Sequence, residues 1–212
     1  MIKIFIESGE NQAIRNGKKT TNEQNFVEEF IAYHFPTLQK GIDFEVRGIG
    51  GKDQLANFVL PFKDNTIAGG KNLLIFDADT ISNQGGYTVR SNDIFTQKQT
   101  LGIDFELFLW PNNHDDGDFE SLLLQMINPA HQCLLDCFEG FEKCVGGNDP
   151  NGIIYKTPDR KSAIYTYINS FIKSQSEEKK MKSGYWFFND PRYWDLNADA
   201  GKPLLEFLRN NL

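Results

Sequence analysis

The sequence has few cysteines and no long apolar run, and each absence excludes a class of protein. Three cysteines are too few to cross-link a chain of 212 residues, so a disulfide-rich secreted fold is excluded. No apolar run approaches the roughly 20 residues that cross a bilayer. The start, MIKIFIESGE, lacks the basic stretch and the apolar core of a signal peptide. We therefore expect a cytoplasmic protein with no membrane partner.

Positive charge is also scarce. The chain has 22 Lys and Arg residues against 29 Asp and Glu residues, which gives a net charge of −7. Non-specific binding of nucleic acid depends mainly on Lys and Arg, so a surface that is basic over its whole area is excluded. A nucleic-acid substrate stays open where metal ions cancel the charge at one site. The patterns GxGxxG and GxxxxGK[ST] do not occur, which disfavours these modes of dinucleotide and ATP binding.

Short apolar runs alternate with helical patterns along the chain, which is typical of βαβ units. The pattern predicts an α/β protein with a mainly parallel sheet. The expected strands are 2–6, 44–49, 72–76 and 103–109. Six helices are expected. The first follows KKTTNEQN, the second covers the apolar residues from Leu55 onward, and the third spans 93–101. The fourth follows an Asp118 cap, the fifth begins at Thr157-Pro158, and the last includes PLLEFLRNNL. The long polar stretch 8–25 is expected to be a functional or partly disordered loop, and SQSEEKKMKSG a mobile charged loop.

Acidic residues follow three of the four expected strands. The first strand ends at Glu7, the third in Asp77 and Asp79, and the fourth in PNNHDDGDFE, which includes Glu120. The carboxyl ends of parallel strands meet at one edge of a sheet, where ligands bind. Residues two apart on a strand face the same side, so Asp77 and Asp79 are expected to point to one place. Magnesium binds such oxygen ligands, although an Asp at a strand end also serves as a turn former or helix cap.

The order of these segments resembles a known family. IFIE, a helix, LIFDAD and then WPNNHDDGDFESLLL resemble the Toprim domain, which topoisomerases, primases, RNA-maturing nucleases and the overcoming-lysogenization-defect nucleases share. The last segment, with the Cys- and Phe-rich helix after it, is more similar still to a Toprim-like family of uncharacterised bacterial proteins. The resemblance covers about the first two thirds of the chain. It implies a Toprim-like (Rossmann-like) sheet with helices on both faces, in a single domain of residues 1–212 whose helical and aromatic-rich extension, 146–212, packs on it.

The resemblance also implies roles for the acidic residues. Glu7 matches a catalytic general acid or base, Asp77 and Asp79 match a metal-binding pair, and Glu120 matches a further ligand. The implied activity is Mg- or Mn-dependent phosphoryl transfer, with hydrolysis of a nucleic-acid phosphodiester as the leading case. One departure is the long stretch after Glu7, which makes Glu23 the candidate for the acidic position that follows in the family.

Three further features each have more than one interpretation. Lys156, Arg160 and Lys161 border a helix start and either contact substrate phosphates or form a solvated basic face. The aromatic segment GYWFFNDPRYWDL has three interpretations: its rings stack on bases, cover the core, or contact another protein chain. Cys133 and Cys137 share one helix face, where cysteine is usually a small buried hydrophobe. The alternative to an enzyme is a non-catalytic Toprim-like interaction or regulatory module.

Overall fold

A parallel sheet organises the fold. The structure, a computed structural model, describes residues 1–9, 20–147, 154–182 and 184–212. In this part of the chain one sheet has the strand order β2-β1-β3-β4, and every neighbouring pair is parallel. The strands are β1 (Ile2–Ile6), β2 (Phe44–Gly48), β3 (Lys71–Asp77) and β4 (Glu106–Trp110). The predicted α/β class and the four predicted strands are therefore confirmed, with ends that differ by a few residues.

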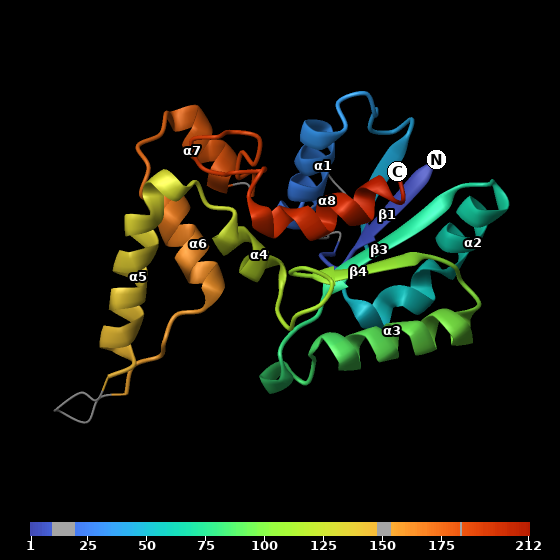
Figure 1. Ribbon diagram of the computed structural model, residues 1–212, viewed down its shortest axis with the longest axis horizontal. Helices are drawn as coiled ribbons and strands as arrows, with labels where there is room; N and C mark the ends of the chain where they lie inside the picture. Colours follow the sequence, from blue (N-terminus) through green and yellow to red (C-terminus); the bar gives the residue numbers. More distant parts are fainter. Residues whose placement is uncertain (10–19, 148–153, 183) are drawn as a thin grey trace.

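Helices cover both faces of the sheet, as expected (Figure 1). One face carries α2 and α3, and the other carries α1 and α8. The helices are α1 (Asn22–His34), α2 (Val59–Ile67), α3 (Tyr87–Leu101), α4 (Phe119–Gln125), α5 (Gln132–Val145), α6 (Arg160–Asn169), α7 (Gln175–Lys182) and α8 (Lys202–Arg209). A 3₁₀ helix, η1 (Lys52–Phe58), precedes α2. None of the described helices combines the length and the apolar character needed to span a membrane.

Alternating side chains of the strands divide the core into two clusters. On β1, Ile4 and Ile6 belong to the cluster under α1, whereas Phe5 belongs to the cluster under α2 and α3. On β3, Leu73 and Ile75 alternate with Leu74 in the same way. Because both faces are covered, β1 and β3 each contain an unbroken apolar stretch, Ile4–Ile6 and Leu73–Phe76. The same alternation decides toward which face a side chain at a strand end points.

Three helix boundaries differ from the prediction for physical reasons. α3 begins at Tyr87 rather than at residue 93, because Asp116, far along the chain, accepts a hydrogen bond from the Tyr87 amide at 2.7 Å. α6 is capped by Asp159 rather than at Thr157-Pro158; its Oδ1 accepts from the Ser162 amide at 2.8 Å. α1 begins at Asn22, with Thr21 as its cap. The predicted Asp118 cap of α4 is confirmed, with Ser121 completing a capping box.

The prediction of a mobile loop at SQSEEKKMKSG is wrong. Residues 175–182 form α7, which has acidic residues in its first turn and lysines in its last, as the helix dipole favours. Met181 is buried and anchors the helix, and Glu177 pairs with Arg192 at 2.9 Å. The expected loop at 8–25 falls largely on residues 10–19, which lie outside the described residues.

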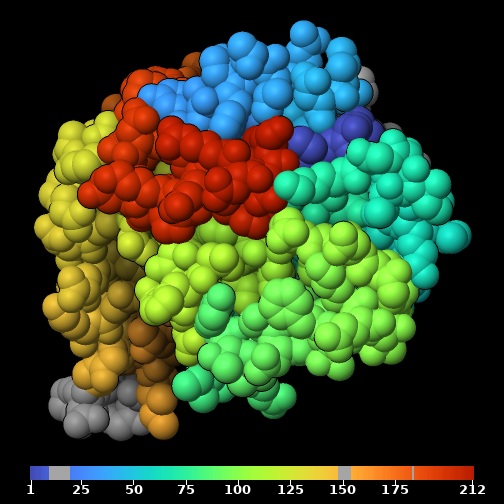
Figure 2. All heavy atoms as spheres, turned by 45° about the vertical axis from the view of Figure 1, so that its right-hand side comes forward, coloured from blue at the N-terminus to red at the C-terminus, as the bar shows by residue number. Residues whose placement is uncertain are grey.

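The aromatic C-terminal segment covers the core. Trp186, Phe188, Tyr193 and Trp194 are each at most 3 % exposed and belong to the cluster that includes α1. Figure 2 shows the last part of the chain, in red, lying between α1, in blue, and the green middle of the chain. Of the three interpretations, the structure therefore supports the core, and these four rings have no exposed face on which bases could stack.

Candidate functional site

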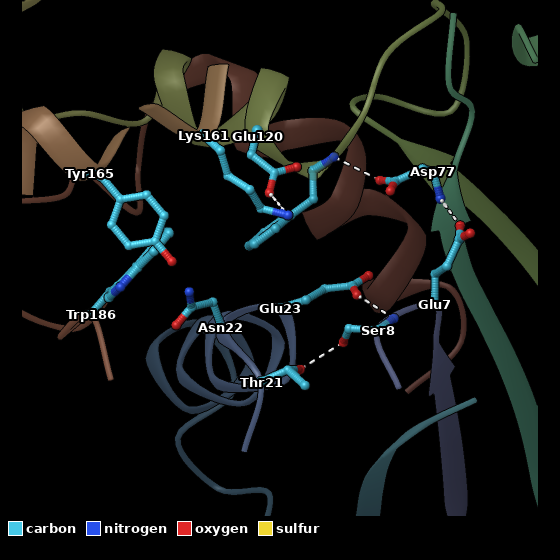
Figure 3. Close-up of a pocket in the computed structure, with 11 residues that line it drawn as sticks. Glu7, Ser8, Thr21, Asn22, Glu23, Asp77, Glu120, Lys161, Tyr165 and Trp186 are labelled. Carbon is cyan, nitrogen blue, oxygen red and sulfur yellow. Dashed lines mark hydrogen bonds and ion pairs between the residues drawn. The ribbon is translucent and has the colours of Figure 1, made fainter. Parts of the chain in front are cut away.

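A polar pocket lies at the carboxyl edge of the sheet, at the ends of β1 and β3 (Figure 3). It has a volume of about 370 Å³. Its walls come from both strand ends, the start of α1, the start of α4, one side of α6 and the C-terminal segment. The lining residues are Glu7, Ser8, Thr21, Asn22, Glu23, Asp77, Phe119, Glu120, Lys161, Tyr165 and Trp186. The structure thus brings together Glu7, Asp77 and Glu120, three of the four acidic residues with an implied role, and also Glu23, the candidate for the further acidic position.

Glu7 and Asp77 are held by backbone amides. The Asp77 amide donates to Glu7 Oε2 at 2.9 Å, so the end of β3 fixes the side chain that follows β1. Asp77 Oδ1 accepts from the Phe119 amide at 2.8 Å, which ties the first turn of α4 to the same place. Both carboxylates therefore have defined positions without a paired cation.

Glu23 is buried at the base of the pocket. Its Oε2 accepts from the Ser8 amide at 2.9 Å, and its Oε1 accepts from Trp110 Nε1 at 2.8 Å. Ser8 Oγ and Thr21 Oγ1 lie 2.6 Å apart beside it, and join the end of β1 to the cap of α1. The sequence suggested Glu23 as an acidic candidate, but Trp110 as its partner lies 87 residues away and has no local signal.

The clustered carboxyl groups resist ionisation. Burial, then the negative charges of Glu23, Glu7 and Glu120, raise the pKa of Asp77 to about 9. Burial raises the pKa of Glu23 to about 7 against the opposing effect of its hydrogen bonds. The pKa of Glu7 is also raised, again mainly by burial, and the charge of Asp79 adds to the rise. At neutral pH the pocket therefore favours a bound proton or another positive charge.

Lys161 brings a positive charge to the pocket. Its Nζ lies 3.1 Å from Glu120 Oε1. Burial lowers the pKa of Lys161, but the charge of Glu120, its hydrogen bond and the charge of Asp77 together outweigh this effect, so the pKa is raised. Arg160 instead pairs with Asp118 at 2.8 Å and lines a neighbouring pocket that shares Glu120 and Lys161. Lys156 is exposed and does not line either pocket. Of the three basic residues singled out in the sequence, Lys161 is the one placed beside the carboxylates.

Asp79 does not line the pocket. The strand ends at Asp77, and Asp79 has a positive φ of 59° that breaks the alternation of side chains. Its carboxylate forms an ion pair with Arg90 of α3, on the opposite face from α1. The expectation that Asp77 and Asp79 point to one place is therefore wrong, because it assumed an extended backbone through residue 79.

Two aromatic rings form the other end of the pocket. Tyr165 and Trp186 pack edge to face, with ring centroids 5.3 Å apart. Figure 3 shows them on the side away from Glu7 and Asp77. Trp186 is nearly buried, whereas Tyr165 is 49 % exposed. Tyr165 was not among the candidate site residues of the sequence, so its place in the pocket was missed.

The donor chemistry of the pocket fits a divalent cation. Glu7, Asp77, Glu23 and Glu120 offer carboxylate oxygens, which magnesium and manganese prefer. The raised pKa values of Glu7, Asp77 and Glu23 indicate that positive charge would relieve the site. However, among the described residues no three His, Cys, Asp or Glu side chains are already arranged around one metal position. Binding would therefore require side chains to turn, Glu120 first, since the side chain of its partner Lys161 is 61 % exposed.

The glycines of RGIGG have a structural role. A Cβ at Gly48 would lie 2.1 Å from the Ser8 carbonyl oxygen, and the Gly50 and Gly51 amides both donate to the Glu7 carbonyl oxygen. The loop therefore packs closely against the strand end that carries Glu7.

Comparisons with models of protein families, with curated proteins and with solved structures found no match for this chain.

Proposed function

We propose that the protein is a Toprim-like, Mg- or Mn-dependent phosphoryl-transfer enzyme whose substrate is a nucleic-acid phosphodiester. The observation that supports this most is the pocket in which Glu7, Glu23, Asp77 and Glu120 meet from four different elements. Acids brought together in this way repel one another unless a proton or a cation relieves the repulsion. The raised pKa values of Asp77, Glu23 and Glu7 point to a site built for added positive charge.

Five residues of the pocket have a role in this proposal. Asp77 and Glu120 would hold the cation, and the cation would polarise the phosphate and stabilise the negative charge that develops on it. Glu7 has a raised pKa and a fixed position, and accepts the proton of the attacking water as general base. Lys161 leaves Glu120 and binds a non-bridging phosphate oxygen. Tyr165, half exposed at the far end, packs against the sugar or base next to the cleaved bond.

Asp79 has a supporting role in the proposal. Its ion pair with Arg90 keeps it out of the pocket, yet its charge still acts on Glu7. We therefore assign the metal-binding role implied by the family to Asp77 and Glu120, and treat Asp79 as a residue that positions the end of β3.

The test is cleavage of single- and double-stranded DNA and RNA in the presence of manganese. Glu7→Gln, Asp77→Asn and Glu120→Gln should each reduce the cleavage rate by at least about tenfold, or 1.4 kcal/mol. Glu106→Gln is the matched control, because Glu106 is an exposed carboxylate at the start of β4. It should cleave as the wild type does.

One observation favours a second candidate, a non-catalytic module that binds a partner with the same pocket. The described residues contain no preformed group of three metal ligands, and Lys161 neutralises Glu120 in the absence of a metal ion. This candidate predicts no cleavage of any of the four substrates and no change of melting temperature with manganese. It also predicts that a protein partner co-purifies with the wild type and is lost with Lys161→Ala.

A further inference from the structure

Helix α5 has one face that packs against the protein and one that does not. It lies at the edge of the molecule, outside α6 (Figure 1). None of its residues is fully buried. The partly buried ones lie on the side that contacts α6; they are Leu134, Leu135, Phe138, Glu142 and Val145. The opposite side faces solvent along the whole helix, and Figure 2 shows α5, in yellow, at the surface.

The solvent side carries small apolar residues at regular spacing. Cys133, Cys137, Gly140 and Cys144, which we call the α5 seam, follow each other at intervals of four, three and four residues. All three cysteines are exposed, and Phe141 beside the seam is 53 % exposed. The prediction that Cys133 and Cys137 are buried in the chain is therefore wrong. Alternating intervals of three and four are those of a helix pair that packs along a seam.

Gly140 is the one seam residue without a side chain. It lies in the interior of α5, where glycine costs about 0.5–1 kcal/mol relative to alanine. A Cβ at Gly140 would meet no atom within 4 Å, so no described contact of the chain requires glycine there. Glycine is required in a helix where another backbone comes close. No described part of the chain thus packs on Gly140, and a second helix lying along this face would come close to it.

We propose that the α5 seam binds the α5 seam of a second copy of the chain, with the two helices antiparallel. In this arrangement Cys133 lies opposite Cys144 of the second copy, and Cys137 lies opposite its Gly140. The residue numbers in each opposed pair add up to the same value, so one two-fold axis relates all the pairs. A two-fold interface of this kind closes on itself as a dimer.

The residues that flank the seam favour the antiparallel direction. Asp136 and Lys143 lie on one side of it, and Leu134 and Phe141 lie on the other. In an antiparallel pair each flank meets the same flank of the second copy. Asp136 then faces Lys143, and Leu134 faces Phe141, so opposite charges and apolar side chains both match. A parallel pair would instead place Asp136 against Phe141. The charge pattern is thus complementary to itself in one direction.

The size of the surface sets the strength of the dimer. The 14 residues of α5 extend about 21 Å, and one helix pair of this length buries less than the roughly 1,200 Å² of a stable interface. The dimer is therefore weak and exchanges rapidly. An experiment must trap it, and the exposed cysteines make this possible.

The test uses two variants in which one cysteine of the seam remains. One carries Cys137→Ala and Cys144→Ala and keeps Cys133; the other carries Cys133→Ala and Cys137→Ala and keeps Cys144. A disulfide needs Cα atoms within about 7 Å. With copper phenanthroline as oxidant, the mixture should form a covalent heterodimer. Each variant alone should lose the dimer band, since its cysteines lie at opposite ends of the antiparallel pair.

Charge reversal gives the second measurement. Asp136→Lys places lysines opposite one another and should abolish the cross-link between the two variants. Adding Lys143→Asp should restore it, and Glu106→Lys, an exposed reversal at the start of β4, should leave it unchanged. Cross-linking of either variant with itself would show a parallel pair and overturn the proposal. A mixture that yields no heterodimer would also overturn it, and would indicate a different partner or none for this face.

Discussion

Glu7 and Asp77 are joined by a hydrogen bond of 2.9 Å from the Asp77 amide to Glu7 Oε2. The bond follows from the register of two adjacent parallel strands, in which Ile6 lies beside Ile75. It places two acidic side chains at neighbouring strand ends and leaves burial and mutual repulsion to act on both. A group of this kind gains from any bound positive charge, so its response to protons and to cations can be measured.

The first prediction concerns pH. The pKa of Asp77 is about 9 in the folded protein against an ordinary value of 3.8, so the folded protein keeps a proton that the unfolded chain has released. The contribution of this group to stability is therefore complete below about pH 4 and is lost as the pH rises toward 9. Glu23, with a pKa of about 7, acts in the same direction over a narrower range. Stability should fall between pH 5 and pH 9 in urea titrations without divalent cations, and Asp77→Asn should reduce this fall.

Asp104→Asn is the control for the pH series. Asp104 is an exposed carboxylate whose pKa is lowered by Lys98, so its charged form is favoured. Removing it should not reduce the loss of stability at high pH. If Asp77→Asn and the wild type show parallel curves, Asp77 does not hold a proton in the folded state.

The second prediction concerns divalent cations. An ion that binds the folded state alone stabilises it by about 2.7 kcal/mol at a hundredfold excess over its Kd. Manganese or magnesium should therefore raise the melting temperature, most strongly near pH 9, where protons no longer compete for the carboxylates. Asp77→Asn and Glu120→Gln should each reduce the rise, and Glu106→Gln should not. A melting temperature that is independent of both ions, across this pH range, would contradict the metal site.

The third prediction separates Asp79 from the pocket. Arg90 is only 6 % exposed and pairs with Asp79, so Asp79→Asn leaves a buried charge with a weaker partner. We expect Asp79→Asn to lose about 1–3 kcal/mol of unfolding free energy. Asp104→Asn, which breaks an exposed ion pair, should lose less than about 1 kcal/mol. The manganese-induced rise in melting temperature should persist in Asp79→Asn. Its disappearance there would instead assign Asp79 to the metal.

The fold was predictable because its signals are local. Apolar runs gave the strands, and Asp118 before Phe119 gave the start of α4. The errors arise where distant residues act on each other. Asp116 extends α3 to Tyr87, and Arg192 helps to hold α7 through Glu177. The hydrophobic periodicity of a segment does not predict contacts with distant residues.

The site was predictable to the same extent. Glu7, Asp77 and Glu120 follow strand ends or open a helix, and parallel topology alone brings them to one edge. Asp79 was misplaced because one residue with positive φ turns its side chain toward Arg90. Tyr165 and Trp186 lie far from the acidic motifs in the sequence, and join the pocket through the packing of α6 and the C-terminal segment.

The fourth prediction compares Lys161 with Arg160. The two residues are adjacent in the sequence but differ in position. Lys161 lines the carboxylate pocket, whereas Arg160 lines the adjacent pocket, beside Asp118. If Lys161 releases Glu120 to bind a phosphate, Lys161→Met should weaken binding of a single-stranded oligonucleotide and reduce the slope of log K against log salt by about 0.7, the value for one contact to a single strand. Arg160→Met removes an equal charge at the surface, and should change this slope less. Equal slopes for the two variants would show that both residues act through net charge, and that the pocket does not bind the phosphate.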